Sequence, residues 1–178
     1  VGASKGTPAR TRCSTCANRA LATHSGWDFD PTTFEPVTLH DRAGRPRTFH
    51  FRSHIVGTGH HMRAFEIVDD EPGGHQFEVL DEFEVEAQAL HDQLLEKIGR
   101  GLARKNLEHH ELGPHIPVHR PIVGRIEWDE AAEDELGVKV PAVIIDGQRY
   151  SWLDFGHMWM TYEGFHFRLE MIDKTDEG

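Results

Sequence analysis

The sharpest chemical motif in the chain is formed by its only two cysteines, Cys13 and Cys16, spaced as Cys-x-x-Cys. A turn of this kind can bring two thiolates to one Zn²⁺, which prefers thiolate and imidazole ligands in a tetrahedral shell. The neighbouring residues are mostly polar, so a metal could supply folding energy that apolar burial cannot. The motif therefore predicts a zinc site, with two unliganded thiols and a redox pair as the alternatives.

A structural zinc ion needs four ligands, and the chain has no further cysteine to offer. His24 is the nearest candidate for the third ligand. Alternatively, two chains could each contribute one Cys-x-x-Cys turn to a shared ion. Further candidates for the remaining ligands are the histidines of the middle part of the chain, His40, His50, His54, His60 and His61.

The charge of the chain limits its partners. Its 178 residues contain 19 Lys and Arg against 30 Asp and Glu, a formal charge of −11, together with 14 His. An acidic body repels phosphate backbones, which disfavours a dedicated nucleic-acid-binding function. Residues 1–20 are an exception, with basic but no acidic side chains, and could bind an acidic partner. A protein partner or a homodimer is therefore favoured over nucleic acid.

Hydropathy predicts a soluble, cytoplasmic protein. No apolar run approaches the roughly 18 residues of a membrane span, so no membrane contact is expected. Residues 1–12 lack the apolar core of a signal peptide. Two cysteines are also too few for a disulfide-stapled secreted fold.

The pattern of apolar residues predicts an α+β fold in three parts. Residues 1–33 form an N-terminal arm that carries the cysteines, residues 34–110 an antiparallel sheet with a long helix, and residues 122–178 a smaller α+β unit packed on it. The Pro-rich stretch 111–121 is interpreted as a linker.

The first unit is predicted to be a four-stranded antiparallel meander with one face in solvent, covered on the other face by a helix over 85–109. Two side-chain sets alternate along the second strand and should lie on opposite faces, namely Phe49, Phe51 and Ile55 against His50, Arg52 and His54. If the polar face binds a ligand, its arginine and histidines favour an anion. Gly99 and Gly101 are poor helix residues and indicate a kink or close packing.

The last unit is predicted to run strand, hairpin, helix, strand. Asp146-Gly147 is a strong signal for a tight turn, and Ser151 resembles a helix N-cap. Phe165, Phe167 and Leu169 alternate with polar residues, so they are expected to form a closing strand buried against the helix.

Motifs for common catalysis are absent: the chain has no Walker loop, no Gly-x-Ser-x-Gly and no His-Glu-x-x-His. Both ends of the chain nevertheless resemble uncharacterised bacterial proteins of unknown function, a resemblance that implies no activity. It is carried by Cys13-x-x-Cys16-x-Asn18, Ser151-Trp152, Phe155-Gly156, Thr161-Tyr162-Glu163-Gly164-Phe165 and Leu169-Glu170.

The preferred interpretation is a zinc-containing accessory or binding protein that is not an enzyme. Two alternatives stay open. One is a His-dependent metalloenzyme acting on a small substrate, and the other is a regulatory module that binds an acidic partner through residues 1–20.

Overall fold

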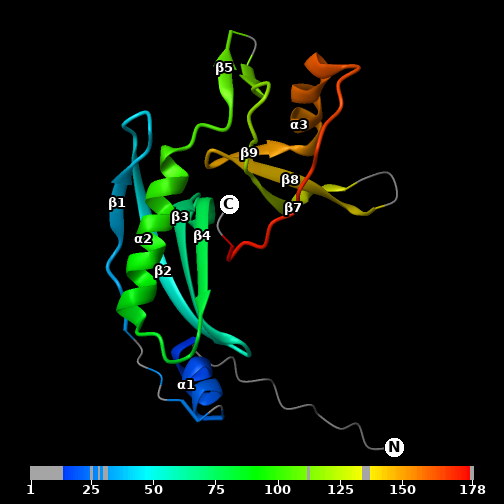
Figure 1. Cartoon of the computed structure of the whole chain (residues 1–178). Coiled ribbons are helices and arrows are strands. Elements are labelled where there is room, and N and C mark those ends of the chain that lie inside the picture. The colour runs from blue at the N-terminus through cyan, green and yellow to red at the C-terminus, as the bar shows by residue number, and fades with distance from the viewer. Residues whose placement is uncertain are drawn as a thin grey trace, which may run out of the picture.

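Two antiparallel sheets, each packed against a helix, organise the chain (Figure 1). The structure is a computed structural model that describes residues 14–24, 26–27, 29, 32–111, 113–133 and 137–176. It has the α+β fold that the sequence predicts. Among the described helices, none combines the length and the apolar character that a membrane span requires.

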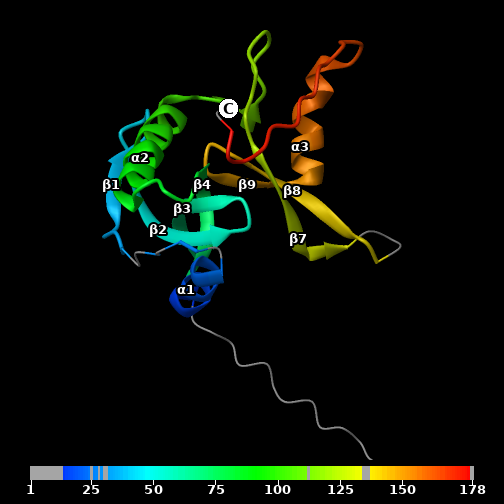
Figure 2. The ribbon, with the colours of Figure 1, turned by 60° about the horizontal axis from the view of Figure 1, so that its bottom comes forward.

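The first sheet has the strand order β1-β2-β3-β4, with every neighbouring pair antiparallel, and is therefore a meander. The helix α2 lies along one face of it, as Figures 1 and 2 both show. The bounds of this part are α1 (Ser14–His24), β1 (Val37–His40), β2 (Pro46–Val56), β3 (Gly59–Val68), β4 (Glu71–Asp81) and α2 (Ala87–Ala103).

The core of this unit lies between the sheet and α2. Phe49 and Met62 from the sheet and Leu94 from the helix are all fully buried there. The predicted division of β2 into two faces is confirmed, because Phe49 and Phe51 pack in this core while the ring of His54 stacks on His61 on the opposite face. Strand periodicity alone positions these side chains.

The helix α2 is shorter than the predicted span 85–109. It ends at Ala103. Beyond this end a tertiary contact holds the chain, because the backbone N–H groups of Asn106 and Leu107 donate to the carboxylate of Asp146, at 3.2 and 3.0 Å. A Cβ on Gly101 would come within 2.3 Å of the Phe77 ring, whereas a Cβ on Gly99 would meet nothing within 4 Å. Gly101 therefore permits close packing of helix and sheet, one of the two roles predicted for these glycines.

The helix α1 lies inside the predicted N-terminal arm, for which no helix was expected. Asn18 attaches it to β2: its side-chain amide donates to Ser53 O at 2.9 Å, and its carbonyl oxygen accepts from Ile55 N at 3.2 Å. The buried Asn18 thus satisfies backbone groups of β2 beyond the segment that pairs with β1.

The second unit is a three-stranded sheet of order β7-β8-β9 with α3 packed on it. The hairpin at Asp146-Gly147 and the Ser151 cap are confirmed, the cap by a hydrogen bond of 3.0 Å from Asp154 N to the serine Oγ. The remaining bounds are β5 (Glu108–His110), β6 (Gly113–His115), β7 (Arg125–Glu133), β8 (Lys139–Ile145), β9 (Gln148–Ser151), α3 (Trp152–Trp159) and the 3-10 turn η1 (Met160–Tyr162).

The predicted closing strand is wrong. Residues 165–173 are extended but form no strand, and Phe165, Phe167 and Leu169 are 65–76% exposed. An alternating segment becomes a buried strand only if a sheet edge lies beside it. Here the segment leaves α3 and runs back toward the first unit, as Figure 1 shows in red.

Candidate functional site

The predicted zinc ligands of the N-terminal arm are not brought together by the described part of the structure. Cys13 lies outside the described residues. Cys16 and His24 are exposed and lie in one helix, eight residues apart, which separates them by about 12 Å along its axis. No group of three or more His, Cys, Asp or Glu within the described ranges could hold a metal ion.

His60 is a core residue rather than an available ligand. It is 1% exposed, and its ring nitrogens lie 2.6 Å from Ser53 Oγ and 3.5 Å from Val85 O. The ring of Trp27 covers it, with the ring centres 5.5 Å apart. Burial lowers the pKa of His60 and favours its neutral form.

Of the other four candidate histidines, His40 is exposed at the end of β1. The remaining three lie on the open face of the first sheet, opposite α2. His54 and His61 face each other across β2 and β3, with ring centres 6.2 Å apart. His50 stacks on Phe65 at 6.1 Å. Burial, and then the neighbouring His61, lower the pKa of His54.

Two arginines form the centre of this open face. Arg52 of β2 and Arg63 of β3 are directly opposite each other. Their guanidinium carbons lie 5.4 and 5.5 Å from the centre of the same Phe65 ring. Both cations are thereby held in place by cation–π contacts, although like charges opposite each other destabilise a sheet.

These arginines have few acidic partners. Arg52 pairs with no carboxylate in the described part of the chain. Arg63 Nε is buried without a hydrogen-bond partner, and it lies 3.9 Å from Glu78 Oε1. A buried donor without an acceptor lowers the stability of the folded chain, unless a ligand or a water molecule accepts its hydrogen bond.

Glu78 of β4 is the buried acid at the edge of the arginine pair. One of its oxygens, Oε2, lies 2.8 Å from both His61 Nε2 and Lys174 Nζ. Burial alone would raise the pKa of Glu78, but the hydrogen bonds from His61 and Lys174 lower it to about 2. Glu78 is therefore ionised and already neutralised, so it does not cancel the charge of Arg52.

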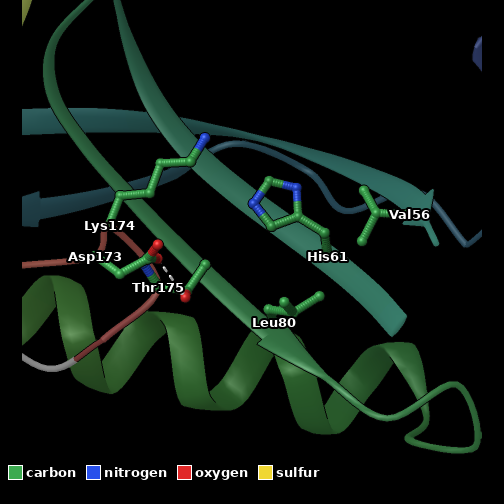
Figure 3. Close-up of a pocket in the computed structure, with 6 residues that line it drawn as sticks. All are labelled: Val56, His61, Leu80, Asp173, Lys174 and Thr175. Carbon is green, nitrogen blue, oxygen red and sulfur yellow. Dashed lines mark hydrogen bonds between the residues drawn. The ribbon is translucent and has the colours of Figure 1, made fainter. Parts of the chain in front are cut away.

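The C-terminal segment borders this face. The ammonium group of Lys97 on α2 donates to the backbone oxygens of Lys174, Thr175 and Asp176 at 2.7–3.3 Å. Between this segment and the sheet is an open pocket of about 260 Å³. Its lining residues, drawn in Figure 3, are Val56, His61, Leu80, Asp173, Lys174 and Thr175.

Two family models match the chain. Residues 30–103 match a domain of unknown function, DUF7686, and residues 107–176 match a second one, DUF7713. This confirms the predicted likeness to uncharacterised proteins, while Cys13 and Cys16 lie outside both matched ranges. No curated protein and no solved structure matches the chain.

The two matched ranges meet at the candidate site. Arg52, Arg63 and Glu78 lie in the range that matches DUF7686, and Lys174 lies in the range that matches DUF7713. Sequence reasoning found Arg52 with its two histidines but missed the other members. The pairing of Arg63 with Arg52 depends on strand register, and the contact of Lys174 with Glu78 joins residues 96 positions apart.

Proposed function

We propose that this protein is a binding protein whose ligand is a small anion held on the open face of the first sheet. The observation that carries the proposal is the pair Arg52 and Arg63, which share the Phe65 ring. Arg52 pairs with no described carboxylate, and the ion pair of Arg63 with Glu78, at 3.9 Å, leaves its buried Nε without a hydrogen bond. A guanidinium group offers several donors in a planar fork that fits carboxylate and phosphate oxygens.

The size and charge of the ligand follow from the rest of the molecule. The chain has a formal charge of −11, which repels extended polyanions such as nucleic acids. A small ligand with a single phosphate or carboxylate group avoids most of this repulsion. The nearby His54 and His61 add hydrogen-bonding groups next to the arginines.

A binding role is also favoured over the alternative of a His-dependent metalloenzyme. The described histidines divide between the core, the open face and exposed positions, and no set of three ligands forms among them. The proposal keeps the cytoplasmic location predicted from the sequence.

The proposal predicts that inorganic phosphate or acetate, added to the full chain, shifts the side-chain NMR signals of Arg52 and Arg63 in a saturable way. Arg52→Gln and Arg63→Gln should each weaken binding at least about tenfold, because each removes charge-assisted hydrogen bonds. Comparing the two anions distinguishes a phosphate ligand from a carboxylate ligand.

Arg100→Gln is the matched control. It changes the net charge by the same amount, and Arg100 is exposed on α2, away from the arginine pair. It should leave binding unchanged. Both variants should keep the wild-type melting temperature, because removing one of two opposed arginines should not destabilise the sheet. A loss of binding at an unchanged melting temperature is then a loss of ligand contacts and not of folding. Equal binding by the double arginine variant and the wild-type chain would contradict the proposal.

Zinc at Cys13 and Cys16 is a separate proposal for the N-terminal arm. Cys16 is exposed on the first turns of α1, where a second chain can reach it. Because His24 lies about two helical turns away, we favour an ion shared by two chains.

Metal analysis of the purified protein should therefore find about half a zinc ion per chain. Cys13→Ser should abolish this zinc, whereas His24→Ala should retain it. One zinc ion per chain that is lost in His24→Ala would instead identify His24 as a ligand. Metal-free protein would rule out the site.

A further inference from the structure

The segment that leaves η1 is extended and lacks a backbone partner. Phe165 N donates to Tyr162 O at 2.9 Å, and beyond this bond no backbone hydrogen bond in the described part of the chain involves residues 166–172. Figures 1 and 2 show the segment running from the end of α3 toward the first unit. Its backbone donors and acceptors are available to pair with another strand.

The side chains of this segment alternate as they do in a half-buried strand. Phe167, Leu169 and Met171 are 76%, 75% and 73% exposed, and their spacing of two residues would place them on one side of a strand. Large apolar side chains gathered in this way are typical of an interaction surface. Phe167 also contacts Trp159 of α3, with ring centres 5.9 Å apart, so the helix supports one edge of this surface.

The charged residues of the segment indicate what covers it. Arg168 and Glu170 flank Leu169, are 88% and 69% exposed in their side chains, and lie 3.6 Å apart within one chain. If two copies of the segment pair antiparallel about Leu169, Arg168 of each copy lies opposite Glu170 of the other. The same register places Phe167 of each copy opposite Met171 of the other. Opposite charges and apolar side chains are therefore paired in one and the same register.

We propose that residues 167–171 of two copies of this chain pair as antiparallel strands around a two-fold axis at Leu169, forming a homodimer. The pairing satisfies the open backbone groups and buries the apolar side chains of both copies. It is isologous, since the same segment serves on both sides, and it closes at two subunits. The inference is independent of the anion-binding proposal.

A charge exchange tests the register. In the Arg168→Glu variant, residues 168 and 170 are both glutamates, so the dimer has two pairs of opposed glutamates. In the Glu170→Arg variant, the same two pairs consist of opposed arginines. In sedimentation equilibrium, each single variant should weaken dimerisation about tenfold or more relative to the wild-type chain. The double variant Arg168→Glu/Glu170→Arg restores both opposite-charge pairs and should return to within about threefold of the wild-type dissociation constant.

Because these side chains are exposed, the variants should keep the wild-type melting temperature when measured at monomeric concentrations. Leu169→Lys is a second test, since it places two ammonium groups at the axis and should abolish the dimer. Hydrogen exchange should slow at residues 167–171 as the concentration rises. A wild-type chain that stays monomeric up to millimolar concentration would overturn the proposal. A dimer that both single variants leave unchanged would also overturn it and would place the interface on another surface.

Discussion

Asp146→Ala should lower the free energy of unfolding by about 3 kcal/mol, because it removes the acceptor of several hydrogen bonds at the junction between the chain after α2 and the turn from β8 to β9. The Asp146 carboxylate accepts from the backbone N–H groups of Asn106 and Leu107 and from the Asn106 side chain, at 2.7–3.2 Å. Asn106 and Leu107 are buried, so water cannot easily replace these bonds.

The backbone at Asp146 adds to this effect. Its φ of 52° lies in the left-handed region, which alanine adopts at a cost of about 1 kcal/mol and which Asp and Asn tolerate. Asp146→Asn is therefore the matched control, because it keeps an acceptor oxygen and the turn conformation. It should lose less than half as much stability as Asp146→Ala in urea unfolding followed by circular dichroism. Equal losses in the two variants would show that the carboxylate bonds do not stabilise the junction.

Leu94→Ala should also destabilise the chain, by about 2–5 kcal/mol, through the cavity it leaves between α2 and the first sheet. Leu94 is fully buried and packs in the core with Phe49 and Met62. The strands that carry Phe49 and Met62, β2 and β3, are paired on both sides and cannot easily collapse into the space. Urea unfolding gives the change directly.

Phe167→Ala is the contrasting variant. The sequence predicts a buried Phe167, whose truncation would cost about 3–5 kcal/mol, but this side chain is 76% exposed. The structure therefore predicts a loss below about 1 kcal/mol when the monomer is measured. A large loss at low protein concentration would show that the segment is buried within its own chain.

Local periodicity determined the larger part of the first unit. One buried face is specified by the alternation from Phe49 to Ile55, and another by the helical spacing of Leu90, Leu94 and Ile98. Both patterns are local and do not depend on residues elsewhere in the chain. Met158 and Tyr162, four residues apart in the second unit, likewise pack in its core. The turn at Asp146-Gly147 and the Ser151 cap depend on neighbouring residues alone and were also predicted correctly.

Contacts between distant residues decided the rest. The apolar alternation from Phe165 to Met171 resembles that of β2, but only the presence of a neighbouring strand makes such a segment part of a sheet. The chain that follows α2 is held by Asp146, 40 residues further along the sequence. The helix α1 is attached to β2 by Asn18, for which the sequence offers no periodic signal.

The candidate site shows the same division. The sequence by itself determined that Arg52 and the histidines beside it point away from the core, because successive strand residues alternate between faces. Only the tertiary structure placed Arg63 opposite Arg52 and Lys174 beside Glu78. Strand register and domain docking are set by the packing of whole surfaces, so no short stretch of sequence encodes them.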